Sequence, residues 1–438
     1  MNAILTDLYQ LTMAAGYWQS GKASEVATFE LFVRRLPPHR NFLVAAGLAQ
    51  AVEYLLNLRF TDDELAYLRK LPQFHNAGDA FFQMLSGFRF TGDVFAVPEG
   101  TPVFAGEPIL TVRAPLLEAQ IPETYLLAMV GFQSLIATKA ARMVESAAGR
   151  AVVEFGTRRA HGPEAGVLAG RAAFVGGCTG TSNTLSGMKY GIPVFGTAAH
   201  SWVQSFPSET EAFARLYELL GPATTFLIDT YDTQEGARRA TQLGKPFWGV
   251  RLDSGDLAGL SKAVRGILDS AGFPEAKIMA TGDLNEYKIT DLLAVGAPID
   301  AFGAGTELAT SADAPSHGAV YKLVEIGAGA EKRATAKFSA EKSTLPGAKQ
   351  IFRYADYDVL GLAGECRMGC EALLRPVVLH GEPIGPQPTI VESRDYARRC
   401  LAALPDEVRG LEVVAEPRRI RQSVELIQLR EAVLRRRS

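Results

Sequence analysis

Hydrophobic and polar positions divide the first 150 residues into helical stripes and short strands. The stripe that begins after Thr6 and Asp7, either of which can cap a helix, predicts a first helix that carries Tyr9. The other expected elements are a strand over 26–37, helices over 43–58 and 61–71, a small antiparallel unit over 88–115, and a long helix from Pro122 to about Ala148.

From residue 151 the pattern changes to short apolar runs separated by segments with helical periodicity. The runs begin near residues 151, 172, 192, 224, 247, 277 and 299. Strands that alternate with helices at this spacing predict parallel β/α units, and a series of seven favours a barrel. Nearly every run ends in glycine beside a polar residue, so we expect these ends to line one rim, where the active site would lie.

After Lys322 the pattern returns to short β-rich runs. We expect these runs to pack against the N-terminal β unit. The predicted fold class is therefore α/β: an irregular (β/α) barrel over 121–319, beside a β-rich α+β domain assembled from both ends of the chain, 1–120 with 320–400. Residues 405–438 are expected to form a helical tail.

Composition narrows the class of protein. The 438 residues are 47% hydrophobic and 21% charged, with 42 glycines, as is typical of a globular enzyme with many tight turns. A net charge of −3 argues against a broad nucleic-acid surface. The N-terminal segment has no basic leader, and no apolar run approaches the ~20 residues that span a bilayer. We therefore expect a cytoplasmic protein without a membrane or nucleic-acid partner.

The segment 191–206, GIPVFGTAAHSWVQSF, presents the most distinctive candidate chemistry. Ile192 to Phe195 reads as a buried strand that stops at Gly196, and His200 follows among small residues. A histidine at the carboxyl end of a buried strand is where α/β enzymes place reacting groups. A core histidine that begins the next helix is the alternative reading of the same pattern.

Three further blocks favour an anionic, phosphate-bearing ligand. Phe155 is followed by two arginines in EFGTRRAHG (154–162), and arginine suits bidentate binding of phosphate or carboxylate. Arg251 and Asp253 are two apart, so on a strand they would face the same side. The loops in 280–289 and 301–308 are rich in glycine and precede helices, an arrangement that binds phosphate on backbone N–H groups. Walker and Rossmann glycine motifs do not occur at the strand ends.

These blocks also occur in an order that resembles the nicotinate phosphoribosyltransferase family. The similarity runs from about residue 5 to about residue 390 and is carried by FELFVRRLP, EFGTRRAHG, FVGGCTGTSN, GTAAHSWVQSF, LIDTYDT, GVRLDSGDL, ATGDLNEYKI, DAFGAGTEL and VYKLVEI. The resemblance implies synthesis of nicotinate mononucleotide from nicotinate and phosphoribosyl pyrophosphate (PRPP), driven by ATP with Mg²⁺. It also implies a head-to-tail homodimer with shared active sites.

The resemblance implies a role for each matching residue. His200 corresponds to the histidine that ATP phosphorylates, Phe155 to an aromatic on one face of the pyridine ring, and Tyr9 to a partner tyrosine on the other. The remaining positions correspond to binding residues. Arg158 and Arg251 match positions near the ring carboxylate and phosphate, and Asp253 and Asp283 match ribose and pyrophosphate ligands. Gly282, Gly305 and Thr306 match positions that bind the 5′-phosphate, and Thr181 and Ser182 match substrate-binding positions. Arg35 and Lys322 match basic positions contributed across the dimer.

Three alternatives remain at the level of sequence. Nicotinamide phosphoribosyltransferase has a similar pattern but carries a carboxylate where this chain has the neutral Ser182 and Asn183, which leave an anionic ring unopposed. Quinolinate phosphoribosyltransferase does not use ATP, so a reactive histidine is not expected there. A non-catalytic metabolite sensor on the same fold is the third, and the intact His200 and Asp253 count against it.

Overall fold

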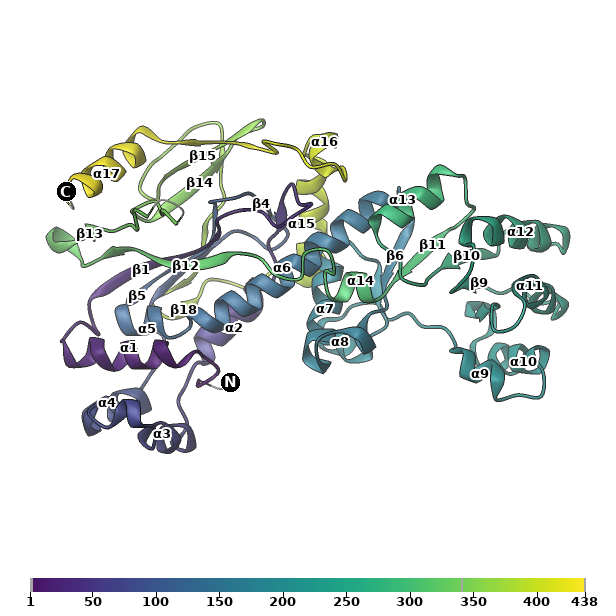
Figure 1. Cartoon of the computed structure of the whole chain (residues 1–438), viewed down its shortest axis with the longest axis horizontal. Coiled ribbons are helices and arrows are strands. Elements are labelled where there is room, and N and C mark those ends of the chain that lie inside the picture. The colour runs from purple at the N-terminus through teal and green to yellow at the C-terminus, as the bar shows by residue number, and fades with distance from the viewer. Residues whose placement is uncertain (1–2, 340–341, 437–438) are drawn as a thin grey trace. The chain divides into compact units, whose positions relative to one another are not determined.

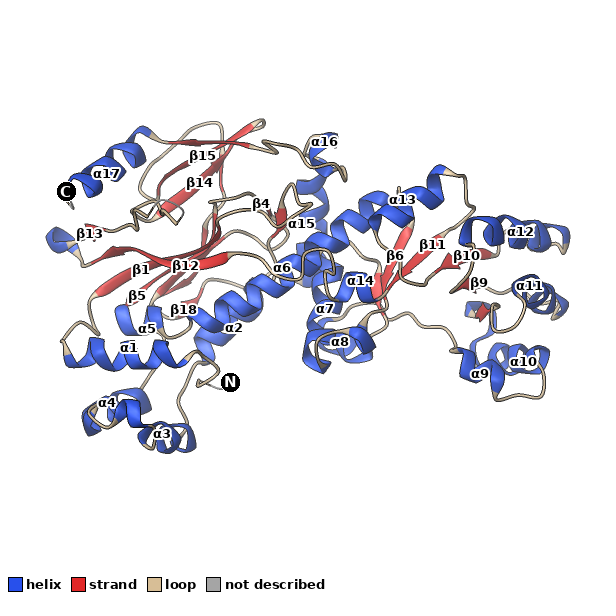
Figure 2. Ribbon diagram, viewed as in Figure 1, coloured by secondary structure: helices blue, strands red, loops and turns tan. Residues whose placement is uncertain are grey.

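Strands from both ends of the chain share one seven-stranded sheet, which confirms that the β-rich part is assembled from both ends. Its order is β13-β12-β1-β5-β3-β17-β18. The central strand β1 (Val26–Val33) pairs antiparallel with β5 (Pro108–Pro115) and with β12 (Ala319–Ile326). The other strands are β3 (Asp93–Ala96), β13 (Arg333–Ala334), β17 (Arg375–Leu379) and β18 (Glu382–Pro383). Figure 1 shows β1, β5 and β12 side by side, and Figure 2 distinguishes the strands from the helices.

The computed structural model describes residues 3–339 and 342–436. These form two compact units, one of Met1–Leu135, Ser316–Thr389 and Val413–Ser438, and one of Ile136–Pro315 and Ile390–Glu412. The residues beyond Val413, expected as part of a separate tail, belong to the first unit. There β19 (Arg419–Gln422) pairs with β15 (Tyr357–Leu362), and α17 (Val424–Arg435) buries Leu426. The last two residues of the expected tail lie outside the described residues.

Two helix starts of the first unit differ in how their free N–H groups are satisfied. Thr61 and Glu64 form a reciprocal capping box at the start of α3 (Asp62–Arg69). Asp7 precedes α1 (Leu8–Gln19) as predicted, but its carboxylate accepts a hydrogen bond from Thr124 instead of capping the helix. The remaining helices are α2 (Leu48–Asn57), α4 (Gly78–Ser86), α5 (Leu116–Gln120) and α6 (Glu123–Ser146), the last of which continues into the second unit.

Two smaller sheets complete the first unit. The helix expected from residue 43 begins only at Leu48, because residues 43–44 form strand β2, which pairs with β4 (Pro102–Val103). The four-stranded sheet has the order β16-β14-β15-β19, with β14 at Lys349–Arg353 and β16 at Glu371–Ala372. Apolar side chains from the N-terminal strands and from Ile351, Leu360 and Leu426 form one continuous core.

The second unit is built on a six-stranded sheet in which every pair is parallel, in the order β7-β6-β11-β10-β9-β8. The strands are β6 (Ala151–Glu154), β7 (Gly180–Thr181), β8 (Thr225–Leu227), β9 (Gly249–Leu252), β10 (Lys277–Ala280) and β11 (Ala301–Ala304). In the described part of the chain the sheet is open, with β7 and β8 at its edges, so the expected barrel is not closed by strand pairing.

Helices alternate with these strands as predicted. They are α7 (Pro163–Val175), α8 (Thr184–Tyr190), α9 (His200–Gln204), α10 (Glu209–Leu220), α11 (Thr233–Gln242), α12 (Leu257–Ser270), α13 (Glu286–Ala294), α14 (Thr306–Ala309), α15 (Ile390–Ala402) and α16 (Asp406–Arg409). Ala240, Val250, Val264 and Ile278 are fully buried where helices meet the sheet.

Two of the seven expected strands are wrong. The apolar run near residue 172 is the buried end of helix α7. It was mistaken for a strand because a buried stretch of helix and a buried strand have the same unbroken apolar pattern. Ile192 to Phe195 forms no strand beyond a single bridge between Val194 and Thr181, and Val194 and Phe195 are 46% and 41% exposed. Hydrophobicity alone does not distinguish a packed strand from an apolar loop.

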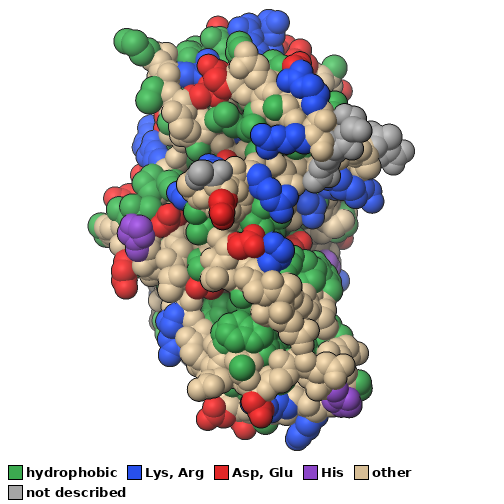
Figure 3. Space-filling view, turned by 90° about the vertical axis from the view of Figure 1, so that its left-hand side faces the viewer, with side chains coloured by type: hydrophobic (Ala, Val, Ile, Leu, Met, Phe, Trp, Pro, Cys, Tyr) green, Lys and Arg blue, Asp and Glu red, His purple; other side chains and the backbone are tan. Residues whose placement is uncertain are grey.

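The described helices include none that is long and apolar enough to cross a membrane. On the face shown in Figure 3, lysine and arginine side chains are interspersed with acidic and apolar ones.

Candidate active site

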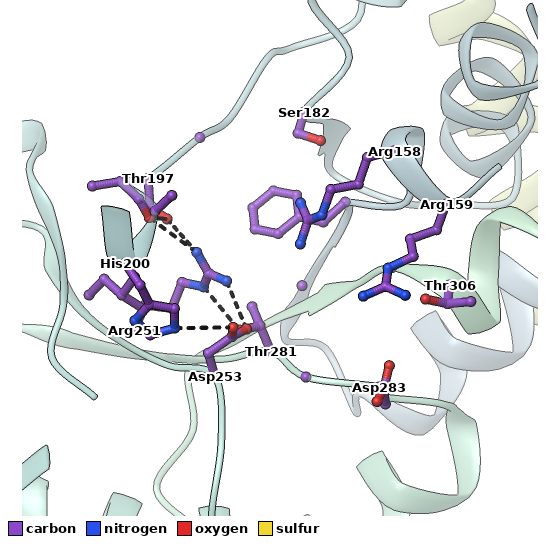
Figure 4. Close-up of a pocket in the computed structure, with 18 residues that line it drawn as sticks. Arg158, Arg159, Ser182, Thr197, His200, Arg251, Asp253, Thr281, Asp283 and Thr306 are labelled. Carbon is purple, nitrogen blue, oxygen red and sulfur yellow. Dashed lines mark hydrogen bonds and ion pairs between the residues drawn. The ribbon is translucent and has the colours of Figure 1, made fainter. Parts of the chain in front are cut away.

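The second unit contains a cavity of about 610 Å³ at the carboxyl ends of its parallel strands. Glycines and residues with short side chains form much of its wall, while arginines, a histidine and carboxylates face the interior (Figure 4). The lining residues are Phe155, Arg158, Arg159, Ser182, Gly196, Thr197, Ala198, Ala199, His200, Leu227, Arg251, Asp253, Thr281, Gly282, Asp283, Gly303, Gly305 and Thr306. The rim predicted from the strand ends is therefore the wall of one pocket.

Arg251 connects three parts of this wall. It lies on β9, and its guanidinium donates from Nε to Thr281 at 2.9 Å and from Nη1 to Thr197 at 2.8 Å. Nη2 donates to the Oδ1 atom of Asp253 at 2.7 Å. Because the planar guanidinium donates in fixed directions, it holds these groups in one arrangement.

Asp253 follows β9 and lies on the same side as Arg251, as their spacing predicted. Burial would raise the pKa of the Asp253 carboxyl, but hydrogen bonds from Thr281 and Arg251 and the charge of Arg251 hold that pKa below its ordinary value. Its backbone N–H donates to Asp229 at 2.9 Å, and Asp229 also accepts from Ser254 at 2.7 Å. Asp253 is thus a fixed, ionised acceptor.

His200 is the first residue of α9, and its side chain lines the cavity instead of entering the core. The ring is 40% exposed, so the alternative of a core histidine is wrong. Nδ1 lies 3.1 Å from the hydroxyl of Thr230, and Nε2 lies 3.7 Å from Oδ2 of Asp253. The imidazole is oriented from both sides and still reachable from the pocket.

The two glycine loops approach the cavity with their backbones. Gly282 has φ +91°, and a Cβ at this position would overlap the carbonyl oxygen of Asp253. Asp283 also has a left-handed backbone, with φ +47°, an unusual conformation for a residue with a side chain. Gly305 and Thr306 stand at the start of α14. Exposed backbone N–H groups at such turns bind phosphate oxygens.

Phe155 and two arginines form another part of the wall. Arg158 and Arg159 lie on a short 3₁₀ helix, Thr157–Arg159, both are exposed, and both extend into the pocket in Figure 4. Within residues 3–339 and 342–436, neither guanidinium has a hydrogen-bond or ion-pair partner. Gly303 faces the Phe155 ring, where a Cβ would lie 2.8 Å from Cδ2. The Phe155 ring therefore packs directly against the backbone of Gly303.

Two candidate residues from the GTGTSN block are placed differently. Ser182 lines the cavity. Thr181 is fully buried and is not a lining residue: its hydroxyl donates to Oε2 of Glu154 at 2.6 Å. Asn183 caps α8 through a bond from the N–H of Ser186 at 2.8 Å. Thr181 and Asn183 thus support the wall from behind.

Tyr9, Arg35 and Lys322 belong to the first unit and are not among the lining residues. Tyr9 is 49% exposed, and its hydroxyl lies 3.5 Å from Glu123. Arg35 is exposed just after β1. Lys322 on β12 is half-buried, and this burial, with Arg34 and Lys337 nearby, lowers the pKa of its ammonium group.

Sequence reasoning did not assign site roles to Arg159, Thr197 and Thr281, although all three line the pocket. Arg159 directly follows Arg158, and neighbouring side chains usually point in different directions, so only one of the two was expected to face the pocket. Thr197 and Thr281 bond to Arg251 from loops far apart in the chain, a relationship that only the fold reveals.

A cavity of arginines, carboxylates and glycine loops at the carboxyl ends of a parallel sheet is typical of α/β proteins that bind phosphorylated small molecules. The chain belongs to the nicotinate phosphoribosyltransferase family: residues 4–131 match the N-terminal domain of that family and residues 151–344 match its family domain. This confirms the resemblance noted in the sequence.

Individual relatives agree with this assignment. The chain is 47% identical to a nicotinate phosphoribosyltransferase of Mycobacterium tuberculosis over 94% of its own length and 89% of the relative's. It is 47% identical to that of Bacillus subtilis, with 80% and 72% covered. The crystal structure of human nicotinic acid phosphoribosyltransferase superposes with a TM-score of 0.87 at 30% identity, covering 98% of this chain and 100% of the human one.

Proposed function

We propose that this protein transfers the phosphoribosyl group of PRPP to nicotinate, with ATP hydrolysis coupled to the transfer. The observation that carries the proposal is the combination, in one cavity, of the Phe155 ring, two exposed arginines and two glycine loops. A planar anion and a phosphorylated sugar need these different surfaces close together. The comparisons support the same activity, since the relatives are named for it.

Each surface has a role in the proposed reaction. Phe155 stacks on the pyridine ring, and Arg158 or Arg159 binds the ring carboxylate, since both guanidinium groups are available to a ligand. The loops at Gly282 and Gly305 bind the 5′-phosphate on backbone N–H groups. Asp253 accepts from ribose hydroxyl groups.

The chemistry requires positioning more than proton transfer. The ring nitrogen of nicotinate forms a bond to the anomeric carbon while the bond from that carbon to pyrophosphate breaks, so positive charge develops on the ribose. Asp253, held ionised by Arg251 and Thr281, stabilises that charge. No general base is needed, because the attacking nitrogen carries no proton at neutral pH.

His200 is proposed to accept the γ-phosphoryl group of ATP. Its ring is oriented by Thr230 and faces the cavity, so a phosphoryl group on it would lie within the PRPP site. Hydrolysis of that group then favours product formation. Arg251 holds Asp253 beside this ring, which joins the coupling residue to the transfer site.

Mg²⁺ is the expected metal for a pyrophosphate substrate, and the donors present fit it. Asp253 and Asp283 line the cavity, and Asp229 has a buried Oδ1 atom without a hydrogen-bond partner among the described residues. Mg²⁺ binds through one or two carboxylates together with phosphate oxygens. When bound, the ion neutralises the leaving pyrophosphate.

Residues outside the cavity fit a shared site in a dimer. Tyr9, Arg35 and Lys322 lie on the first unit, and in the proposed head-to-tail homodimer they complete the partner's site. Tyr9 would then cover the second face of the ring. We propose a cytoplasmic location, where PRPP and ATP are available.

Ser182 distinguishes the proposed activity from that of a nicotinamide phosphoribosyltransferase. A nicotinamide enzyme needs a carboxylate to accept the amide hydrogens, whereas Ser182 is neutral and lies in a pocket with three arginines. The test is product formation from PRPP and ATP with nicotinate, nicotinamide or quinolinate as acceptor. Nicotinate should give by far the highest kcat/KM. Equal or better turnover of nicotinamide or quinolinate would overturn the proposal, and binding without turnover would favour a sensor.

A further inference from the structure

A buried cluster of charges adjoins the candidate active site without lining it. Lys139 and Arg142 lie on α6 with side chains 1% and 2% exposed. Between them is the fully buried carboxylate of Glu286, whose Oε2 is 2.7 Å from Nζ of Lys139 and whose Oε1 is 2.9 Å from Nε of Arg142. The ammonium group of Lys139 also lies 2.8 Å from Asp313 and 3.7 Å from Glu307.

The acidic members of this cluster stand directly behind the two glycine loops. Glu286 is the first residue of α13, which begins just after Gly282 and Asp283. Glu307 is the second residue of α14 and follows Gly305 and Thr306. One ammonium group therefore contacts the starts of both helices that carry the phosphate-binding loops.

Stability alone does not explain this cluster. Taking charges out of water costs free energy, and an apolar replacement of a buried ion pair is often neutral or stabilising. The loop in front of it has a left-handed backbone at Asp283, a conformation that persists only where the surroundings impose it. Burial would raise the pKa of Glu286, but Lys139 and Arg142 hold it below its ordinary value, so Glu286 remains ionised.

We propose that Lys139 is a positioning residue for phosphoribosyl binding. It joins the starts of α13 and α14 and so fixes the loops at Gly282 and Gly305 at the separation that one phosphorylated ligand requires. Lys139 does not touch the ligand but acts through Glu286 and Glu307. This inference rests on the proposed function, since it names PRPP as the ligand.

The test compares two buried lysines. Lys139→Met removes the contact between the loops, while Lys349→Met breaks a similarly buried pair, Lys349 with Glu30 at 2.7 Å, in the unit without the cavity. Both variants should lower Tm. Only Lys139→Met should raise the KM for PRPP, by about 10–100-fold as for other displaced orienting groups, with KM for nicotinate changed much less.

A double variant separates positioning from folding. Lys139→Met with Glu286→Gln removes one charge of each sign, so it should recover part of the Tm lost by the single variant, yet the KM for PRPP should remain raised. The inference would be overturned if the double variant folds and its KM for PRPP lies within about twofold of the wild-type value, since a twofold change is a small difference in binding free energy. An equal rise in Lys349→Met would also overturn it.

Measuring the Kd for PRPP by calorimetry tests the positioning role of Lys139 separately from the proposed transfer activity. An inactive wild-type protein would contradict the proposed transfer, but its Kd for PRPP could still be compared with that of Lys139→Met. Weaker binding in the variant supports the positioning role, and equal binding overturns it.

Discussion

Nη2 of Arg251 lies 2.7 Å from Oδ1 of Asp253, and the other donors of the same guanidinium engage Thr281 and Thr197. The pair is two residues apart in sequence, yet it joins wall segments that come from three different β/α connections. Asp253 in turn approaches His200. Arg251 therefore fixes Asp253, the proposed sugar-binding carboxylate, next to His200, the candidate coupling histidine.

The first prediction concerns this guanidinium. Arg251→Lys should lower kcat/KM by about 10²-fold, because a single ammonium group cannot donate in three fixed directions and the wall loses its alignment. Steady-state kinetics with nicotinate and PRPP measure the effect.

Arg265→Lys is the matched control. Arg265 also donates in three directions, to Asp269, Ala276 and Phe273, but it lies outside the cavity. It should lose stability while keeping near-normal kcat/KM. Equal kinetic losses in the two variants would contradict a specific role for Arg251.

The second prediction concerns pH. The folded pKa of Asp253 is below its ordinary value, so its ionised form contributes stability that is present above the unfolded pKa of about 3.9 and is lost as pH falls toward the folded pKa. The wild type should therefore exceed Asp253→Asn in Tm near pH 6, and this difference should shrink below about pH 4. A difference that stays constant or grows with acid would show that the carboxylate is not stabilised as described.

The third prediction concerns the glycine loop. Gly282→Ala combines a left-handed φ with overlap against the carbonyl of Asp253, so it should destabilise the protein by roughly 1–3 kcal/mol and raise the KM for PRPP. Gly272→Ala has a similar φ, +84°, but no atom within 4 Å of its Cβ, and controls for backbone strain alone. If Gly282→Ala matches Gly272→Ala in both KM and stability, the close approach has no role.

Much of the fold could be predicted from the sequence, because most of the parallel strands, β6, β9, β10 and β11, are short, mainly apolar and followed within three residues by glycine. The run from residue 172 was misassigned because the second half of helix α7, Ala169–Val175, is entirely buried and so shows no amphipathic stripe. Ile192 to Phe195 failed because the apolar residues lie in a partly exposed loop. The local pattern therefore identified strands that are bounded by glycine. It misassigned the two apolar runs whose burial or exposure depends on segments far away in the sequence.

The candidate site shows the same limit. Arg251 and Asp253 were identified from the end of β9. His200 was identified from an expected strand that makes only a single bridge, yet its side chain lines the cavity. Thr181 was expected to bind substrate, but its hydroxyl bonds to Glu154 behind the wall. Lys139 was not assigned a role, since its partners lie far along the chain. Contacts between distant segments decide these roles, and the spacing of residues within one segment does not encode them.

The fourth prediction concerns the proposed dimer. Tyr9→Ala should raise the KM for nicotinate, whereas Tyr67→Ala, another exposed tyrosine of the first unit, should not. Mixing inactive Arg251→Ala with Tyr9→Ala should restore activity, because each heterodimer would hold one intact site. Absence of rescue after verified subunit exchange would contradict a shared site.

The fifth prediction concerns energetic coupling. His200→Ala should abolish ATP hydrolysis and ATP-stimulated synthesis while slow, ATP-independent transfer remains, because Phe155, Asp253 and the glycine loops still bind both substrates. A general base would behave differently, since its loss lowers the rate by about 10²–10⁴-fold with or without ATP.

Phosphate labelling tests the central role of His200 most directly. The enzyme is incubated with γ-labelled ATP, digested, and examined for acid-labile, base-stable phosphate, with His200→Ala as control. If His200 is the phosphate acceptor, label will be found on the peptide that contains His200 and will be absent from the variant. Label on another peptide, or none in an enzyme that still couples ATP hydrolysis to transfer, would contradict that role.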